Sequence, residues 1–372
     1  MSEELMYDLE DLPEIPERTS QLYKNSLGQL VERVNSLMAS RPDITLLTGG
    51  SPASVMFDNH KNHALFMSAV FSLDAWCLLA RVLPWVYRAY KGRGFDYAYF
   101  PAHLQAWRTA LYELLPPPDA EPLIHVYEWI ESRHEKIIRL SGENVLEAPE
   151  PEPRWEETCG DFLKALLSAD SRACAQLAAD SVDSAADLAG FYLNVIQPSM
   201  YEVGRKWEEG EISVAAEHLA SALVNRVMSM HYLELIKEPP KIKGRAAVTA
   251  SANEFHEIGA TMVANVLEAD GWEVEYLGAN TPMDDFPDFV ASGGFDIVLI
   301  SVTMSFNLES VKEAILRIRE ISDTDSPPVL VGGLLFNQCP EMSEKIGASG
   351  YAADCRQAAV LADKWKQKKK SA

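Results

Sequence analysis

A histidine between two carboxylates follows an apolar run in the last third of the chain. The segment is Glu254-Phe-His256-Glu-Ile-Gly259, directly after the apolar run 246–250. A carboxylate that accepts a hydrogen bond from one imidazole nitrogen fixes the tautomer and leaves the other nitrogen for a metal ion. A glycine in the next turn lets a bulky group approach the chain. The segment therefore predicts a ligand-binding or metal-binding loop in which His256 is the ligand.

Two further signals follow two later apolar runs. Ser301-Val-Thr303 supplies two hydroxyls, and Gly332-Gly333 removes side chains where a ligand needs space. Taken singly, each segment is compatible with an ordinary turn or helix start. The histidine loop and these two segments each follow one of three apolar runs, at the strand ends where such sheets bind ligands. This coincidence favours a single deep ligand-binding slot.

The elements that must position these residues alternate between strand and helix. Apolar runs predict strands at 246–250, 273–277, 296–301 and 328–331. Apolar residues at three- and four-residue spacing predict helices at 257–270, 283–292 and 308–322. This alternation is typical of a doubly wound, Rossmann-like parallel sheet, an α/β fold that binds ligands at the carboxyl ends of its strands. We expect this domain to span residues 244–372.

A second cluster lies in the preceding block, 155–237. Trp207 is followed after nine residues by Glu217 and His218. Helical spacing predicts a four-helix bundle over 155–169, 171–179, 184–201 and 213–235, in which Ser213 caps the last helix. Glu217 and His218 diverge by about 100° on that helix, so only one of them faces the sheet domain directly. A core tryptophan and an ordinary helix histidine are the structural alternative.

The block 244–362 resembles cobalamin-binding domains, whose motifs are [D/E]-x-H-x-x-G, S-x-[T/L] and G-G. The resemblance implies that His256 is the lower cobalt ligand. It also implies that Ser301, Thr303, Gly332 and Gly333 line the slot for the nucleotide tail. Glu254 stands where larger enzymes of this kind have aspartate, so the partner of the histidine is one methylene longer here.

The spacing W-x9-E-H resembles the adenosylcobalamin-dependent photoreceptors of the light-responsive repressor type. That resemblance implies that Trp207 and Glu217 pack on the adenosyl group, and that His218 becomes the upper cobalt ligand after light. It predicts a signalling photoreceptor rather than an enzyme, with a homo-oligomeric state that changes with light. Its downstream protein is unknown, and a light-regulated antirepressor is one compatible output.

A corrinoid protein that carries methyl groups between methyltransferases is the alternative. Such a protein shares the bundle, the sheet domain and His256, but it has no need for Trp207 with Glu217 and His218. An adenosylcobalamin mutase is a poor fit, because no substrate barrel is evident.

The first block, 1–148, is also expected to be helical, over 21–39, 63–81, 103–115 and 123–140. Its acidic leader is expected to be poorly ordered. The light-responsive repressors carry a small basic helix-turn-helix domain, which this acidic block does not resemble, so direct binding to nucleic acid is not expected.

Eight aromatic residues lie between Trp85 and Trp107. In this respect the chain resembles the photocobilin subset of these receptors, which bind a bilin such as biliverdin as a second chromophore. The resemblance implies that these aromatic rings stack on the tetrapyrrole. Side chains that would hold its propionates are Arg88, Arg93, His103 and Arg108. An aromatic core or protein interface is an equally weighted interpretation. Cys77 has apolar flanks, so a covalent attachment there is disfavoured.

Composition excludes several classes of protein. The 372 residues include 33 Lys and Arg against 55 Asp and Glu, a net charge of −22, which disfavours nonspecific binding to nucleic acid and to anionic membranes. The five scattered cysteines argue against a disulfide framework. The acidic N-terminus lacks signal-peptide character, and no apolar run reaches the roughly 20 residues that span a bilayer. We expect a cytoplasmic protein with domain boundaries at the proline-rich stretches 148–154 and 238–244.

Overall fold

A computed structural model describes residues 3–143, 148–235, 242–322 and 326–371. The chain forms two compact units. Unit 1 contains Met1–Val145 together with Glu208–Gly210, and unit 2 contains Leu146–Trp207 and Glu211–Ala372. Most of the expected boundary at 238–244 lies outside the described residues. Among the described helices, none combines the length and apolar character needed to cross a membrane.

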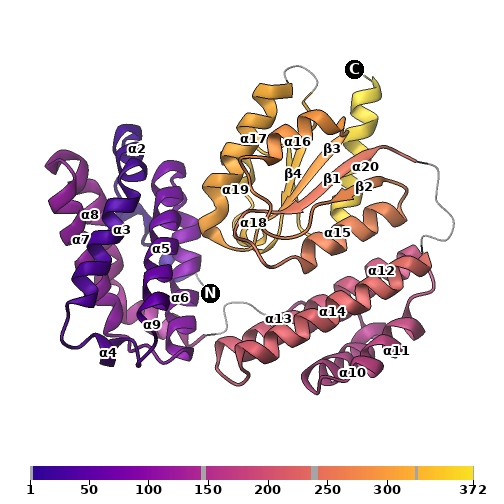
Figure 1. The fold of residues 1–372 in the computed structure, drawn as a ribbon, viewed down its shortest axis with the longest axis horizontal. Helices are drawn as coiled ribbons and strands as arrows, with labels where there is room; N and C mark the ends of the chain where they lie inside the picture. The colour runs from indigo at the N-terminus through magenta and orange to yellow at the C-terminus, as the bar shows by residue number, and fades with distance from the viewer. Residues whose placement is uncertain (1–2, 144–147, 236–241, 323–325, 372) are drawn as a thin grey trace. The chain divides into compact units, whose positions relative to one another are not determined.

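The described part of unit 1 is helical, as expected (Figure 1). The expected helix 63–81 is two helices, because Asp74 adopts a left-handed conformation that ends the first of them. The elements are α1 Glu3–Met6, η1 Leu9–Asp11, α2 Glu17–Asn25, α3 Leu27–Ala39, α4 Ile44–Leu47, α5 Ala53–Leu73, α6 Trp76–Gly92, α7 Tyr99–Leu114, α8 Pro117–Ser132 and α9 His134–Ser141.

The prediction of a poorly ordered leader is wrong. Residues 3–11 form α1 and η1, and Leu5 is completely buried. A buried leucine fixes the leader because removing its side chain from water is favourable.

The helical half of unit 2 is the expected bundle of four long segments. The third segment contains a π-helical turn at Tyr192–Ile196 and continues past residue 201 to Glu208. Ser213 caps the last helix, since its Oγ accepts a hydrogen bond from the backbone N–H of Ala216 at 3.2 Å. The elements are η2 Pro153–Trp155, α10 Glu156–Leu167, α11 Ser171–Ser181, α12 Ala185–Phe191, η3 Tyr192–Ile196, α13 Gln197–Glu208 and α14 Val214–Leu235.

The other half of unit 2 is the expected doubly wound domain. Five parallel strands pair in the order β2-β1-β3-β4-β5. In Figure 1, α15 and α20 lie together on one side of the sheet, and α16 packs against α17 on the other. The elements are β1 Arg245–Ala250, α15 Ile258–Ala269, β2 Glu273–Tyr276, α16 Phe286–Gly293, β3 Ile297–Ser301, η4 Ser305–Asn307, α17 Leu308–Ser322, β4 Val329–Gly332, α18 Leu334–Gln338, α19 Met342–Lys345, β5 Gly350–Ala352 and α20 Cys355–Ser371.

The strand register aligns the ends that carry the motifs. Ala250 pairs with Ser301, Ser301 with Gly332, and Gly332 with Ala352, so four neighbouring strands end in one row. This row is the carboxyl edge at which parallel sheets of this order bind ligands.

Bundle and sheet share one core inside unit 2. Buried residues of α10–α14 and of α15, α20 and the strands form a continuous apolar cluster. The Asn265 amide donates to the Tyr192 hydroxyl at 2.8 Å, and the Asn225 amide donates to Glu257 Oε1 at 2.8 Å. The first bond joins η3 to α15, and the second joins α14 to the residue before α15. Together they place the bundle beside the loop that precedes α15.

Candidate functional site

Glu254 joins the histidine loop to the segment after β3. Its side chain is completely buried. Oε1 accepts hydrogen bonds from Nδ1 of His256 and from the backbone N–H of the same residue, the latter at 3.2 Å. Oε2 accepts from the backbone N–H groups of Thr303 and Met304, both at 2.8 Å. Both carboxylate oxygens are therefore bound, and His256 is held at a fixed position relative to the end of β3.

Glu254 and His256 each stabilise the charged form of the other. Burial by itself raises the pKa of Glu254, but the hydrogen bond and charge of His256 and the two N–H groups bring that pKa below its usual range. Burial by itself lowers the pKa of His256, but Glu254 and the charge of Glu217 raise it. An ionised Glu254 keeps the ring proton on Nδ1. No side chain in the described part of the chain bonds Nε2, so Nε2 is the nitrogen that can bind a metal.

The glycines in the row of strand ends stand where backbone atoms leave no room for a side chain. A Cβ on Gly332 would lie 2.8 Å from the Ala352 carbonyl oxygen, and one on Gly333, at φ +94°, would lie 2.5 Å from the Val302 carbonyl oxygen. The glycine pair thus permits close backbone packing at the strand ends and also keeps them free of side chains. Gly259 faces this row, because a Cβ there would lie 3.8 Å from Ser301 Oγ.

One buried hydroxyl at this edge has no hydrogen-bond partner among the described residues. It belongs to Ser251, which follows β1 and is completely buried. An unpaired buried polar atom is costly, so it indicates a place where a bound polar group completes the structure. The sequence analysis missed Ser251, although it lies three residues before Glu254.

The second cluster lies at the junction of α13 and α14. Trp207 is half-buried at the end of α13. The carboxylate of Glu217 forms a hydrogen bond with Nδ1 of His218 at 2.5 Å and accepts a hydrogen bond from Ser221 Oγ at 2.8 Å. The His218 side chain is 74% exposed. Asn225, further along the same helix α14, bonds Glu257, the residue after His256, so the fold brings these two motifs close to one another.

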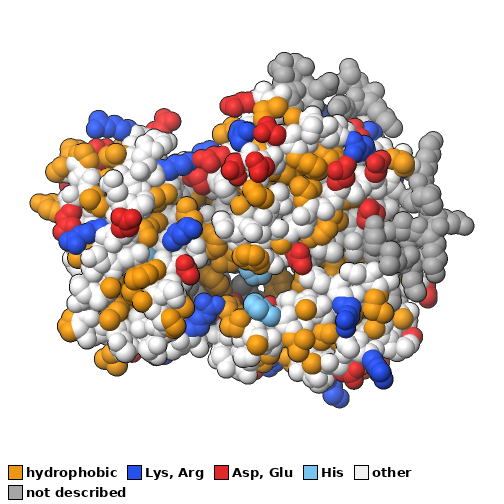
Figure 2. Space-filling view, in the orientation of Figure 1, with side chains coloured by type: hydrophobic (Ala, Val, Ile, Leu, Met, Phe, Trp, Pro, Cys, Tyr) orange, Lys and Arg blue, Asp and Glu red, His pale blue; other side chains and the backbone are white. Residues whose placement is uncertain are grey.

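Histidines and apolar side chains are accessible near these motifs. Figure 2 shows histidine side chains at a hollow in the middle of the view. His218 and His256 are the two histidines of unit 2 whose side chains the structure describes, and both are exposed. Phe255, inside the histidine motif, is 75% exposed, and Val214 and Leu219 of α14 are also exposed. Exposed apolar residues around a polar motif are typical of a ligand surface. Sequence reasoning did not select these three.

The aromatic segment of unit 1 is a packed core. The rings of Tyr87 and Phe100 stack with centroids 3.5 Å apart, and Phe95, Tyr99 and Trp107 are buried. The stacking contact occupies the facing sides of the Tyr87 and Phe100 rings. The structure favours the interpretation as core over a bilin site.

The cations expected to hold propionates are also engaged. Arg88 pairs with Glu208, another residue of unit 1, at 3.0 Å. Arg108 pairs with Glu131 at 2.7 Å, and His103 Nε2 accepts from the Trp107 indole at 2.8 Å. Arg93 is exposed, and Cys77 is half-buried in α6.

Adding biliverdin to the purified protein is therefore expected to give no new long-wavelength absorbance band. A stoichiometric red or far-red band would contradict the interpretation as core.

Comparisons with known proteins agree with the geometry of unit 2. Residues 159–231 and residues 244–360 match two sequence models, each described as a B12 binding domain. Over 207 residues the chain is 26% identical to a corrinoid protein of Desulfitobacterium hafniense, covering 55% of this chain and 95% of that protein. It is 29% identical over 161 residues to the HTH-type transcriptional repressor CarH of Myxococcus xanthus, covering 43% of this chain and 52% of the repressor.

A solved structure shows the same fold. The monomethylamine corrinoid protein of Methanosarcina barkeri superimposes with a TM-score of 0.50 at 21% identity, covering 56% of this chain and 99% of that one. The two B12 binding domain matches and the match to the corrinoid protein of Desulfitobacterium hafniense support the binding of a cobalamin by residues 159–360. Neither B12 binding model reaches residues 1–158.

Proposed function

We propose that the B12 binding domains of this chain hold adenosylcobalamin and that the protein is a light-responsive signalling protein. One observation carries the proposal: Glu217 bonds His218 on α14, and the same helix is bonded through Asn225 to Glu257, the residue after His256. The chain thereby presents two exposed histidines, one from the sheet domain and one from the bundle. The partial match to a transcriptional repressor supports the same assignment.

The residues of the sheet domain would bind the cofactor from below. His256 would ligate cobalt through Nε2 while Glu254 holds Nδ1. Gly259, Ser301, Thr303, Gly332 and Gly333 would line the slot for the nucleotide tail. The donor set suits the group, since an imidazole with a carboxylate behind it is a common metal ligand.

The residues of the bundle would act on the upper side. Adenosylcobalamin supplies a cobalt–carbon bond that light breaks. Trp207 and Glu217 would pack on the adenosyl group in the dark. His218 would then leave its bond with Glu217 and take the upper position at cobalt. A shift of this kind in α14 changes the packing of the bundle on α15, and we propose that it changes the oligomeric state of the protein.

Replacing His218 by alanine tests the upper-ligand role. The variant is expected to bind adenosylcobalamin and to lose the adenosyl group in green light, because neither step needs the His218 ring. It is expected not to give the spectrum of cobalt between two histidines. Absorbance spectra before and after light measure this, with exposed His125 replaced by alanine as the control. A lit spectrum identical to that of the unaltered protein would exclude the role of His218.

A corrinoid protein that carries methyl groups is the second candidate. The specific observation in its favour is the match to a corrinoid protein along 95% of that protein's length. A methyl carrier is expected to work with methylcobalamin and to be indifferent to light. Illumination of the adenosylcobalamin complex, followed by size-exclusion chromatography, separates the two candidates. A photoproduct like that of free cofactor, with an unchanged elution volume, favours the methyl carrier.

Replacing Glu254 by glutamine is expected to weaken corrinoid binding by about 10- to 100-fold. A glutamine NH2 group toward Thr303 and Met304 would face two N–H donors. The same group toward His256 would force the ring proton onto Nε2, the nitrogen needed for cobalt. Titration calorimetry measures the effect. Glu257→Gln is the matched control, because Glu257 bonds Asn225 instead of the histidine. Equal affinities of both variants would contradict the role of Glu254.

A further inference from the structure

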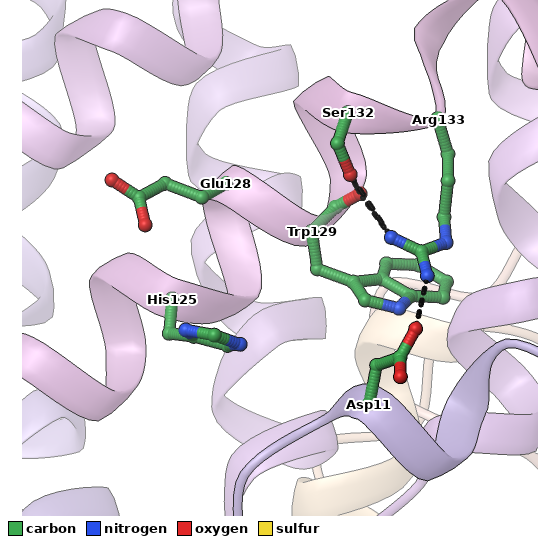
Figure 3. Close-up of a pocket in the computed structure, with 6 residues that line it drawn as sticks. All are labelled: Asp11, His125, Glu128, Trp129, Ser132 and Arg133. Carbon is green, nitrogen blue, oxygen red and sulfur yellow. Dashed lines mark hydrogen bonds and ion pairs between the residues drawn. The ribbon is translucent and has the colours of Figure 1, made fainter.

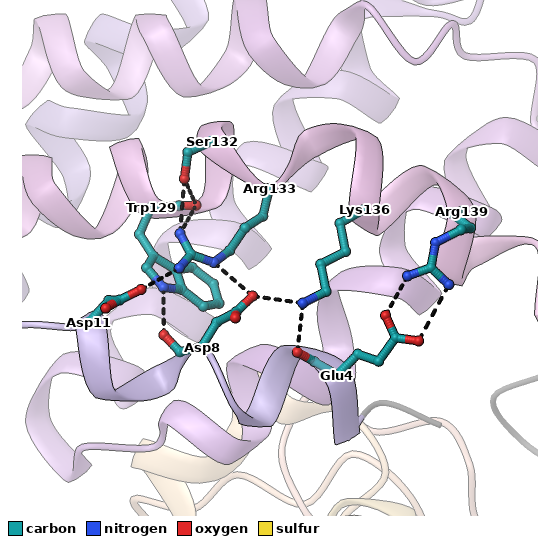
Figure 4. Close-up of polar contacts among 8 residues, drawn as sticks. All are labelled: Glu4, Asp8, Asp11, Trp129, Ser132, Arg133, Lys136 and Arg139. Carbon is teal, nitrogen blue, oxygen red and sulfur yellow. Dashed lines mark hydrogen bonds and ion pairs between the residues drawn. The ribbon is translucent and has the colours of Figure 1, made fainter.

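The acidic leader of unit 1 lies on a row of three cations, which we name the basic stripe (Figure 4). The stripe consists of Arg133, which joins α8 to α9, and of Lys136 and Arg139 in α9. Their spacing of three residues places them on one face of the helix. The opposing acids are Glu4 in α1, Asp8 in the turn that follows it and Asp11 in η1, spaced four and three residues apart in the sequence.

Each of the three acids forms an ion pair with a residue of the basic stripe. Glu4 pairs with Arg139. Asp8 pairs with Arg133 at 3.1 Å and with Lys136 at 2.8 Å. Asp11 pairs with Arg133 at 2.6 Å. The charge pattern of the leader therefore matches that of the stripe along its whole length.

Two further bonds bind the backbone of the leader. The Trp129 indole donates to the carbonyl of Asp8 at 3.0 Å, and Lys136 Nζ donates to the carbonyl of Glu4 at 2.7 Å. Bonds to backbone carbonyls do not depend on side-chain identity, so another segment of the same conformation can receive them. Arg133 stacks on the Trp129 ring at 4.4 Å, which fixes its guanidinium for carboxylates.

The surface extends beyond the leader. An open groove of about 450 Å³ runs beside it and is lined by Asp11, His125, Glu128, Trp129, Ser132 and Arg133 (Figure 3). Several of the ion pairs are solvent-exposed, since the side chains of Asp11 and Glu4 are 68% and 52% exposed. Exposed ion pairs hold a segment weakly. The carboxylates of the leader are therefore held only weakly on the stripe, while the buried Leu5 anchors the leader in the core.

We propose that the basic stripe with Trp129 is a docking site for an acidic segment of a partner protein, and that the leader occupies this site as an intramolecular competitor. Charge complementarity carries the proposal: the stripe is basic in a chain of net charge −22, and each of its cations pairs with a carboxylate of the leader. The inference goes beyond the proposed function, and its test needs no cofactor, so the two can fail separately.

The probe is a fluorescent, alanine-rich helical peptide with three glutamates spaced four and three residues apart. A peptide with glutamines in their place is the control probe. Fluorescence anisotropy measures binding to the full chain, to a chain without residues 2–12, and to the full-length E4Q/D8N/D11N variant. Because the last variant keeps the buried Leu5, it answers the question if the shortened chain does not fold.

The acidic peptide is expected to bind both altered chains at least tenfold more tightly than the full chain. Neutral glutamines, or 300 mM salt in place of 50 mM, are expected to reduce that affinity at least tenfold. Adding K136E and R139E to E4Q/D8N/D11N is expected to abolish binding, whereas adding K61E, at an exposed lysine of α5, leaves it intact. Equal binding to all chains, or no binding to the altered chains, would overturn the proposal. A concentration-dependent dimer of the full chain that E4Q/D8N/D11N abolishes would instead assign the stripe to the leader of a second copy.

Discussion

Replacing His256 by alanine is expected to lower the affinity for adenosylcobalamin on the order of a hundredfold and to leave any bound cofactor without histidine at cobalt. The substitution removes Nε2, which is the free ring nitrogen at the carboxyl edge of the sheet. Glu254 keeps its bonds to the backbone of Thr303 and Met304, so the loop after β3 retains its anchor. The loss therefore reports on metal ligation and not on the fold.

Calorimetry and the absorbance spectrum of the complex measure this result together. His218→Ala is the internal comparison, because His218 is expected to matter only after light. Circular dichroism checks that unit 2 is folded in both variants. If His256→Ala bound the cofactor with unchanged affinity and an unchanged spectrum, the lower ligand would have to be another group.

Acid is expected to destabilise unit 1 well above the pH at which its carboxylates titrate. Its core contains His60, which is fully buried, and His103, which is 6% exposed. His60 Nδ1 donates to Asn35 Oδ1 at 2.6 Å, and its Nε2 accepts from the Tyr99 hydroxyl at 2.9 Å. His103 Nε2 accepts from the Trp107 indole. Protonation of His103 Nε2 would set two donors against each other, and protonation of His60 Nε2 would place a charge in the core and force the Tyr99 hydroxyl to turn.

Burial lowers the pKa of His60 to about 4 and holds that of His103 well below its usual value. Below pH 6.5 these histidines are protonated in the unfolded chain but remain neutral in the folded chain. The free energy of unfolding therefore falls as the pH drops from 6.5 toward 4. His60 contributes about 1.4 kcal/mol per pH unit in that window. At pH 5 this ring alone costs about 2 kcal/mol, out of the roughly 5–15 kcal/mol that stabilise a typical domain, and His103 adds to the loss in the same direction.

Denaturant unfolding of the full chain at pH 7.5 and 5.0 measures this loss, and hydrogen exchange in α5 and α7 assigns it to unit 1. His103→Gln keeps an acceptor for the Trp107 indole and removes one titrating group, so the pH dependence is expected to become shallower by one proton. His125→Asn, at an exposed position of α8, is expected to leave the pH dependence unchanged. Equal unfolding free energies at the two pH values would contradict the prediction.

Much of unit 2 was predictable because its signals are local. The four predicted strands agree with β1–β4 to within two residues, since three of them are mainly apolar runs and β2 alternates charged with apolar or aromatic residues. The strand β5 was missed because Gly350–Ala352 is too short to show a pattern. The interaction of Glu217 with His256 depends on the packing of α14 against α15, which spacing along the chain does not reveal.

The errors in unit 1 have a similar cause. The leader is acidic enough to suggest disorder, but the cations that order it lie about 120 residues later in the chain. Aromatic residues are equally suited to a core and to a chromophore site. Only the contact between Tyr87 and Phe100, and the partners of Arg88 and Arg108, favour the core.

Because one carboxylate binds both His256 and the backbone after β3, the two cannot respond independently. Any event that moves Thr303 or Met304 alters the orientation of the imidazole, and any metal bound to the imidazole restrains those residues in return. Thermodynamic reciprocity requires both effects to have the same free energy. Substitutions at the start of α17, remote from cobalt, are therefore a route by which the affinity for the cofactor can be adjusted without altering any residue that touches it.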